Sequence, residues 1–211
     1  MPKRDKLLNE LQGENDLCAF LLAQAGGVPN ELQLMVQTVV YDPEAKGLRQ
    51  RGSYIIRALG TLEYRIDNLG GTVDTVDFVS EHPLLYPYNT TPAAVFFRGQ
   101  PDDVNELIID ISQAHASTFA GWRHFPEYLN LGQPLVTLLT SGGGLVGQMP
   151  MPLAERIVSA LERHGLETKV MEGEREAEEA HPGFSNTPQV MTIGSSYFVA
   201  YAFSVDELGK V

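Results

Sequence analysis

The sequence has little cysteine and few basic residues, and each shortage excludes a class of protein. Its 211 residues include one cysteine, which cannot form an internal disulfide and so points to a reducing compartment. The 15 Lys and Arg residues are outnumbered by 27 Asp and Glu residues, so the formal net charge is −12. Nucleic acids and anionic membranes are bound by clustered Lys and Arg, and we therefore expect neither as a partner.

Long apolar runs and clear targeting segments are also lacking. No apolar run approaches the roughly 20 residues of a membrane-spanning helix. The N-terminus has basic residues and an apolar run over 17–23, but polar and acidic residues between them interrupt the pattern of a secretion signal. We therefore expect a soluble, cytoplasmic protein.

The familiar catalytic and metal-binding motifs do not occur. There is no Walker pattern, no GxGxxG fingerprint, no HExxH, no paired cysteines and no G-x-S-x-G elbow. We therefore expect no metal and no cofactor.

The chain has the composition of an ordinary folded protein. Hydrophobic residues make up 43% of it, and a chain of this length buries roughly 70% of its unfolded surface. No linker rich in Gly, Ser or Pro divides it. We expect a single domain over 1–211, with a possible subdomain boundary near residue 100.

The first half predicts one helix followed by strands. Apolar residues at helical spacing predict a helix over 4–25, with a kink or split at Gly13. Alternating patterns over 31–98 predict strands. Two of these strands are expected to form a tight hairpin around Gly60, which would place Arg57 opposite Glu63.

The second half mixes helices and strands. Asp103 and Glu106 resemble a capping box before a strongly amphipathic helix, and Pro152 suits the first turn of another helix that Gly165 ends. A strand then follows, and after the polar run 172–179 a hairpin closes the chain. This order predicts an α+β fold with a largely antiparallel sheet, made of an N-terminal meander and a C-terminal hairpin, packed with three or four helices.

The segment from His115 to Tyr128 holds the weak candidates for catalysis, which are His115, His124 and Arg123. A partly buried imidazole beside a carboxylate can act as a general base. The structural alternative is that His115, on the apolar stripe of its helix, is a core residue, and we favour that alternative.

The glycine-rich segment 141–148 is the candidate ligand-binding loop. Backbone N–H groups of such turns can hold an anion before a helix, and the candidates are Ser141, Gly142, Gly143 and Gly144. The alternatives are that Gly142 caps a short helix over 134–140, or that the glycines form a mobile lid.

Aromatic residues are the candidate interface. Two prolines extend the backbone of segment 82–89, so its tyrosines can form a binding edge, or instead pack against a sheet. The candidates are Tyr86, Tyr88, Trp122 and Tyr128.

Five of the basic residues cluster within 46–65, which allows a local anion site or an acidic partner in an acidic chain. Paired, solvated strand faces are the simpler explanation. The members are Lys46, Arg49, Arg51, Arg57 and Arg65.

Two functions are consistent with these patterns. The first is a non-catalytic protein that acts through protein–protein contacts as a homodimer. The alternative is an enzyme or small-molecule binder that holds an anionic ligand at the 141–148 loop, with His115 and His124 nearby.

Overall fold

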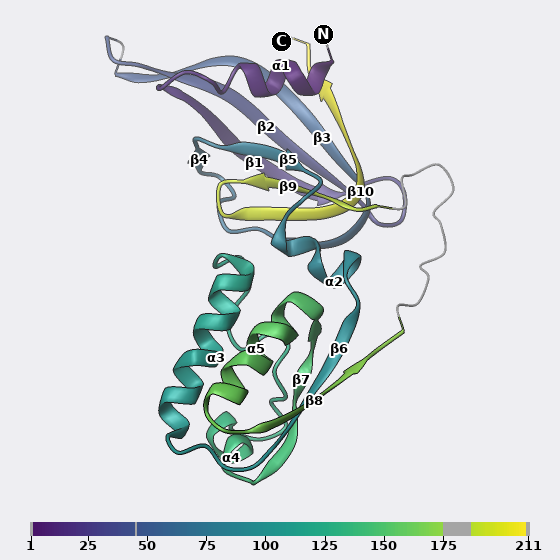
Figure 1. Ribbon diagram of the computed structural model, residues 1–211. Helices are drawn as coiled ribbons and strands as arrows, with labels where there is room; N and C mark the ends of the chain where they lie inside the picture. Colours follow the sequence, from purple (N-terminus) through teal and green to yellow (C-terminus); the bar gives the residue numbers. More distant parts are fainter. Residues whose placement is uncertain (1, 45, 175–186, 210–211) are drawn as a thin grey trace. The chain divides into compact units, whose positions relative to one another are not determined.

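The computed structural model describes residues 2–44, 46–174 and 187–209. Contacts divide the chain into two compact units, Met1–His82 with Glu179–Val211, and Pro83–Glu178 (Figure 1). Each unit has its own cluster of buried apolar side chains. The division falls after residues 82 and 178, whereas the sequence suggested a boundary near residue 100. The expected single domain stays a prediction.

The first unit, which we call unit 1, is a curled antiparallel sheet of seven strands in the order β4-β1-β2-β3-β10-β9-β5 (Figure 1). One helix, α1 (Lys3–Asn9), accompanies the sheet. The strands are β1 (Asp16–Ala25), β2 (Glu31–Asp42), β3 (Gly47–Arg65), β4 (Thr72–Val73), β5 (Val76–Val79), β9 (Gln189–Ile193) and β10 (Ser196–Glu207).

The predicted helix over 4–25 is wrong beyond its first turns, because residues 16–25 form strand β1. The continuous apolar run at 17–23 fits a strand period as well as a helical one. Pairing with β2 decides the outcome, since it supplies backbone partners from Asp16 to Ala25 and buries Cys18 and Phe20. Gly13 marks the break, where its N–H donates to the Asp16 carboxylate at 2.8 Å.

The predicted hairpin around Gly60 is also wrong, because β3 runs unbroken through it. Gly60 has φ +62, and a Cβ there would lie 2.9 Å from the Tyr201 ring. The glycine therefore marks a close approach by β10, the other common meaning of glycine in a strand. Arg57 consequently pairs not with Glu63 but with Asp206, at 2.9 Å.

The second unit, unit 2, joins a three-stranded sheet of order β7-β6-β8 to its helices. Side chains of β6, α3 and α5 share one buried cluster, so the two long helices cover one face of the sheet. The elements are the short 3-10 helix η1 (Pro83–Leu85), α2 (Tyr86–Asn89), β6 (Pro92–Arg98), α3 (Val104–Phe119), α4 (Leu135–Leu139), β7 (Gly143–Pro150), α5 (Met151–Arg163) and β8 (Glu167–Glu172).

The helix signals of the second half are confirmed. The Asp103 carboxylate accepts hydrogen bonds from the N–H groups of Asn105 and Glu106, as an N-cap residue does. Pro152 lies in the first turn of α5, and Gly165 follows its end with φ +75. The predicted closing hairpin is β9 and β10, which pair from Ser196 opposite Ile193.

The fold is therefore broadly α+β with antiparallel strands. The described part of the chain contains five α-helices where three or four were expected. None of its helices has the length and apolar character needed to cross a membrane. Most of the polar run 172–179 lies outside the described residues.

Gly147 is the position where the fold of unit 2 tolerates no side chain. A Cβ there would lie 2.0 Å from the Tyr128 carbonyl oxygen, which is backbone and cannot rotate away. We expect Gly147→Ala to lower the free energy of unfolding by about 3 kcal/mol. Urea denaturation measures this. Gly132→Ala, whose Cβ meets only the Asn130 side chain, is the control, expected to change stability by no more than about 0.5 kcal/mol. Equal losses for both would contradict the assignment.

Candidate functional site

His115 lies in the core of unit 2. It is 2% exposed, and its ring centroid lies 5.1 Å from that of Phe119 and 5.8 Å from that of Phe125. Within the described chain, its Nε2 atom has no hydrogen-bond partner. Burial, together with the positive charge of Arg123, lowers the pKa of His115 and so favours the neutral ring.

Arg123 is buried next to this ring system rather than presented to solvent. Only 8% of the residue is exposed, and its guanidinium pairs with the Glu127 carboxylate at 2.8 Å and lies 5.9 Å from the Tyr128 ring centroid. His124, by contrast, is exposed. The three catalytic candidates therefore divide into a buried pair and one surface histidine, and a catalytic role stays a prediction.

The backbone of this segment is unusual. Ala120 has φ +49 and Tyr128 has φ +77, backbone conformations that are strained for residues other than glycine. The Tyr128 ring stacks on Phe119 at 5.5 Å between centroids, which supports the strained residue by packing. Strain of this kind gathers at functional sites but is also tolerated wherever packing enforces it.

The glycine-rich segment is a turn and a strand, not a loop before a helix. Residues 143–148 pair with β6, and α5 begins only at Met151. The Ser141 hydroxyl donates to the Leu138 carbonyl at 2.7 Å, within the turn itself. The expected loop therefore reduces to the turn at Ser141 and Gly142, directly after α4, and ligand binding by Ser141–Gly144 stays a prediction.

The chain directly after the first candidate segment contacts the glycine-rich segment, but not at Ser141–Gly144. Leu129 bridges Gly147, and the Asn130 N–H donates to the Val146 carbonyl at 2.7 Å. Gly143 and Gly144, at the other end of β7, pair with Arg98 and Phe97. This contact, made by Leu129 and Asn130, is a backbone contact along the edge of β7.

All four interface candidates are half-buried. Tyr86 begins α2 and contacts Phe119 at 6.3 Å between ring centroids, so it belongs to the packing of unit 2. Tyr88, Trp122 and Tyr128 are likewise half-buried. An interface role for these four stays a prediction.

The basic cluster is spread over β3 and the turn before it. Arg51 pairs with Asp16 at 2.8 Å, Arg57 with Asp206, and Arg65 with Asp67 at 3.0 Å. Lys46 and Arg49 have no ion pair within the described residues. Three of the five members thus match the simpler expectation of paired strand faces.

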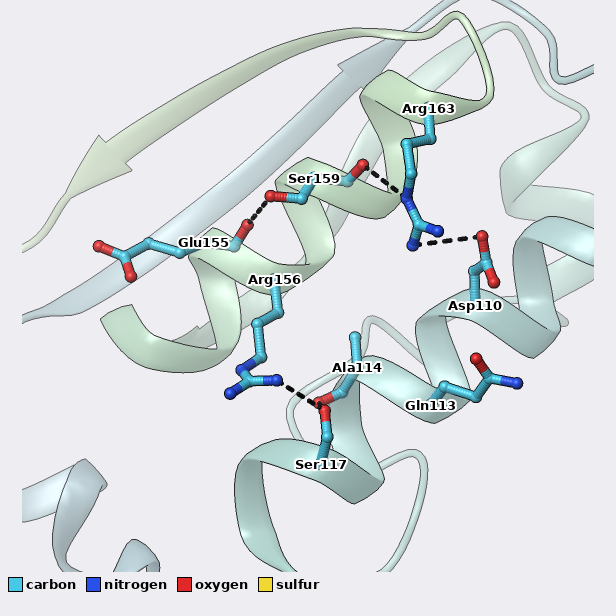
Figure 2. Close-up of a pocket in the computed structure, with 8 residues that line it drawn as sticks. All are labelled: Asp110, Gln113, Ala114, Ser117, Glu155, Arg156, Ser159 and Arg163. Carbon is cyan, nitrogen blue, oxygen red and sulfur yellow. Dashed lines mark hydrogen bonds and ion pairs between the residues drawn. The ribbon is translucent and has the colours of Figure 1, made fainter.

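A groove of about 480 Å³ lies between α3 and α5 (Figure 2). Arg156 donates to the Ser117 hydroxyl at 2.9 Å, while Arg163 and His164 contact the Asp110 carboxylate at 3.3 and 3.0 Å. These contacts join one helix to the other, and both arginines are engaged in them. The groove is therefore a polar seam between two helices.

Within the described residues, no group of three or more His, Cys, Asp or Glu side chains is arranged to hold a metal ion.

Sequence reasoning missed two strand edges that lack a neighbouring strand within the described residues, one on β8 and one on β3. An edge depends on which strands pair, and the alternation of side chains carries no signal for it.

Comparison with known proteins assigns neither a family nor a function, since no family model, curated protein or solved structure matches the chain.

The buried His115 predicts a pH-dependent stability. Its pKa is lower in the folded chain than the usual 6.5, so the unfolded chain binds the proton more readily. The contribution of His115 is therefore fully present above about pH 6.5 and is lost as the pH falls toward the folded-state pKa. We expect urea denaturation between pH 5 and 7.5 to show a shallower dependence on pH for His115→Leu. The exposed His124→Leu is the control; if both variants keep the wild-type slope, the assignment to His115 is wrong.

Proposed function

We propose that this chain is a non-catalytic protein that acts through protein–protein contacts, and that one partner is a second copy of itself. The uncovered edge of β8 carries the proposal. We place the protein in the cytoplasm, because its only cysteine, Cys18, is a buried free thiol whose pKa burial raises to about 12.

The two edges of the three-stranded sheet differ in what covers them. The segment Leu129–Asn130 lies along β7, where Leu129 bridges Gly147 and Asn130 donates to the Val146 carbonyl. On the other side, β8 pairs with β6 alone, and no further strand of the described chain pairs with it. Within the described residues its outer backbone groups therefore lack a strand partner, and a strand from another molecule could pair with them.

The side chains of β8 are more exposed than is usual for a strand in a compact unit. Val170 and Met171 are 39% and 51% exposed. Charged residues flank them at Glu167, Lys169 and Glu172. An apolar pair within a charged strand suits selective pairing, because apolar contact favours association and the charges restrict which register is accepted.

Symmetry narrows the register. In a two-fold symmetric pair of antiparallel edge strands, opposite residues point to the same face of the sheet. One residue therefore lies next to the axis and pairs with its own copy in the other chain. If the axis passed by Lys169, the two Lys169 side chains would lie opposite each other and repel. If it passed by Thr168, the paired segment would extend to Gly165, which belongs to the turn before β8. An axis at Val170 opposes Val170 with itself and Lys169 with Met171. An axis at Met171 would pair only residues 170–172, because β8 ends at Glu172. We therefore place the axis at Val170.

The first test is cross-linking. Val170→Cys places two thiols on the axis, while the buried Cys18 stays unreactive, so we expect mild oxidation to give a covalent dimer. Non-reducing electrophoresis and mass spectrometry measure it. Glu106→Cys, exposed on α3, is the control and should remain monomeric.

The second test removes the apolar contact. The edge spans six residues, so we expect a weak dimer whose population rises with concentration. Val170→Asp opposes two carboxylates and should weaken it at least about tenfold in sedimentation equilibrium. A wild-type chain that stays monomeric at high concentration, or a Val170→Asp chain that dimerises as well as the wild type, would overturn the proposal.

A further inference from the structure

A second uncovered strand edge lies in unit 1, where β3 extends beyond its neighbour β10. Pairing of β10 with β3 ends at Glu207 opposite Tyr54, followed by one hydrogen bond from the Leu208 N–H to the Ser53 carbonyl at 2.8 Å. On its other side β3 stays paired with β2 as far as Gly47. Segment 47–52 is thus paired on one side only within the described residues, and Figure 1 shows this hairpin projecting.

A groove of about 450 Å³ lies where β10 stops. Met35 and Leu208 give it apolar walls, and Gln37, Gln50 and Ser53 give it polar ones. The Gln50 amide donates to the Ser53 hydroxyl at 2.7 Å, and the Ser53 carbonyl accepts the Leu208 N–H. The groove therefore lies over side chains of β2 and β3, beside the end of β10. A strand added along the β3 edge would border it.

The side chains at this end show what kind of strand fits. Tyr41 and Leu48, opposite each other on β2 and β3, are 44% and 52% exposed, so apolar side chains would find contact there. Arg49 is exposed and has no ion pair in the described chain, unlike most of its basic residues. Those that are ion-paired are Lys3, Lys6, Arg51, Arg57, Arg65, Arg123 and Arg163.

Acidic groups are also present at this end and limit the positive charge. Asp42 and Glu44 lie in the adjoining turn, and the Asp42 carboxylate accepts the Glu44 N–H at 3.0 Å. Asp16 is already engaged by Arg51 at 2.8 Å. The cations that remain for a partner are Arg49 and Lys46. They make the edge selective for acidic side chains without making it a nucleic-acid surface.

We propose that the β3 edge at residues 48–52 binds an extended peptide segment, with alternating apolar and acidic side chains, by strand addition. Backbone hydrogen bonds to β3 supply affinity, the apolar side chains pack by Tyr41 and Leu48, and a carboxylate pairs with Arg49. This surface is separate from β8, so the inference does not rest on self-association.

The test uses a fluorescent peptide of alternating valine and glutamate, titrated with the full chain and followed by fluorescence polarisation. We expect saturable binding. The same peptide N-methylated at alternate residues keeps its charge but cannot form the backbone hydrogen bonds, so its binding should be lost. A peptide with lysine in place of glutamate should bind at least about tenfold more weakly.

Protein variants locate the site. Arg49→Glu should weaken binding of the valine–glutamate peptide about tenfold, whereas Arg98→Glu, an equal charge change at an exposed strand residue of unit 2, should leave it unchanged. Val170→Asp should bind normally, which separates this surface from β8. The proposal is overturned by an absence of saturable binding, by equal binding of the N-methylated peptide, or by equal effects of Arg49→Glu and Arg98→Glu.

Discussion

The pairing of β3 with two partners is the constraint on which unit 1 depends. This one strand, Gly47–Arg65, pairs with β2 over residues 47–59 and with β10 over residues 54–65, and β10 comes from much later in the sequence. Closing so long a loop costs conformational entropy, which the extended ladder and the buried side chains around Tyr54 and Ile56 offset. Because the partners do not end together, the same strand leaves the open edge at 48–52.

Unit 2 follows the same principle on a smaller scale. Three strands cannot shield both of their edges, so a neighbouring segment must cover them. Leu129 and Asn130 cover β7, and the absence of a side chain at Gly147 allows this approach. β8 has no such cover in the described chain, and its exposed Val170 and Met171 lie beside charges that restrict pairing. Each unit thus presents one strand edge as its candidate surface.

The candidate surfaces of this chain are backbone edges and not reactive side chains. His115 and Arg123 are buried in one packed cluster, and the hydroxyl of Ser141 is used within its own turn. Side-chain chemistry of these types is visible in a sequence, so it supplied the first candidates. Unpaired backbone groups are the same in every residue type, and only strand order shows where they remain.

Local patterns determined what depends on near neighbours. The Asp103 cap, the amphipathic stripe of α3, the proline in the first turn of α5 and the left-handed Gly165 were all predicted, because capping and helical periodicity act within a few residues. Tertiary structure decided what depends on distant partners. The run 17–23 forms a strand because β2 pairs with it. Gly60 lies inside a strand and not in a turn, where the Tyr201 ring packs against its backbone. A strand makes its ladder hydrogen bonds with other strands, so its end points, and the edges it leaves open, are set only when the sheet is assembled.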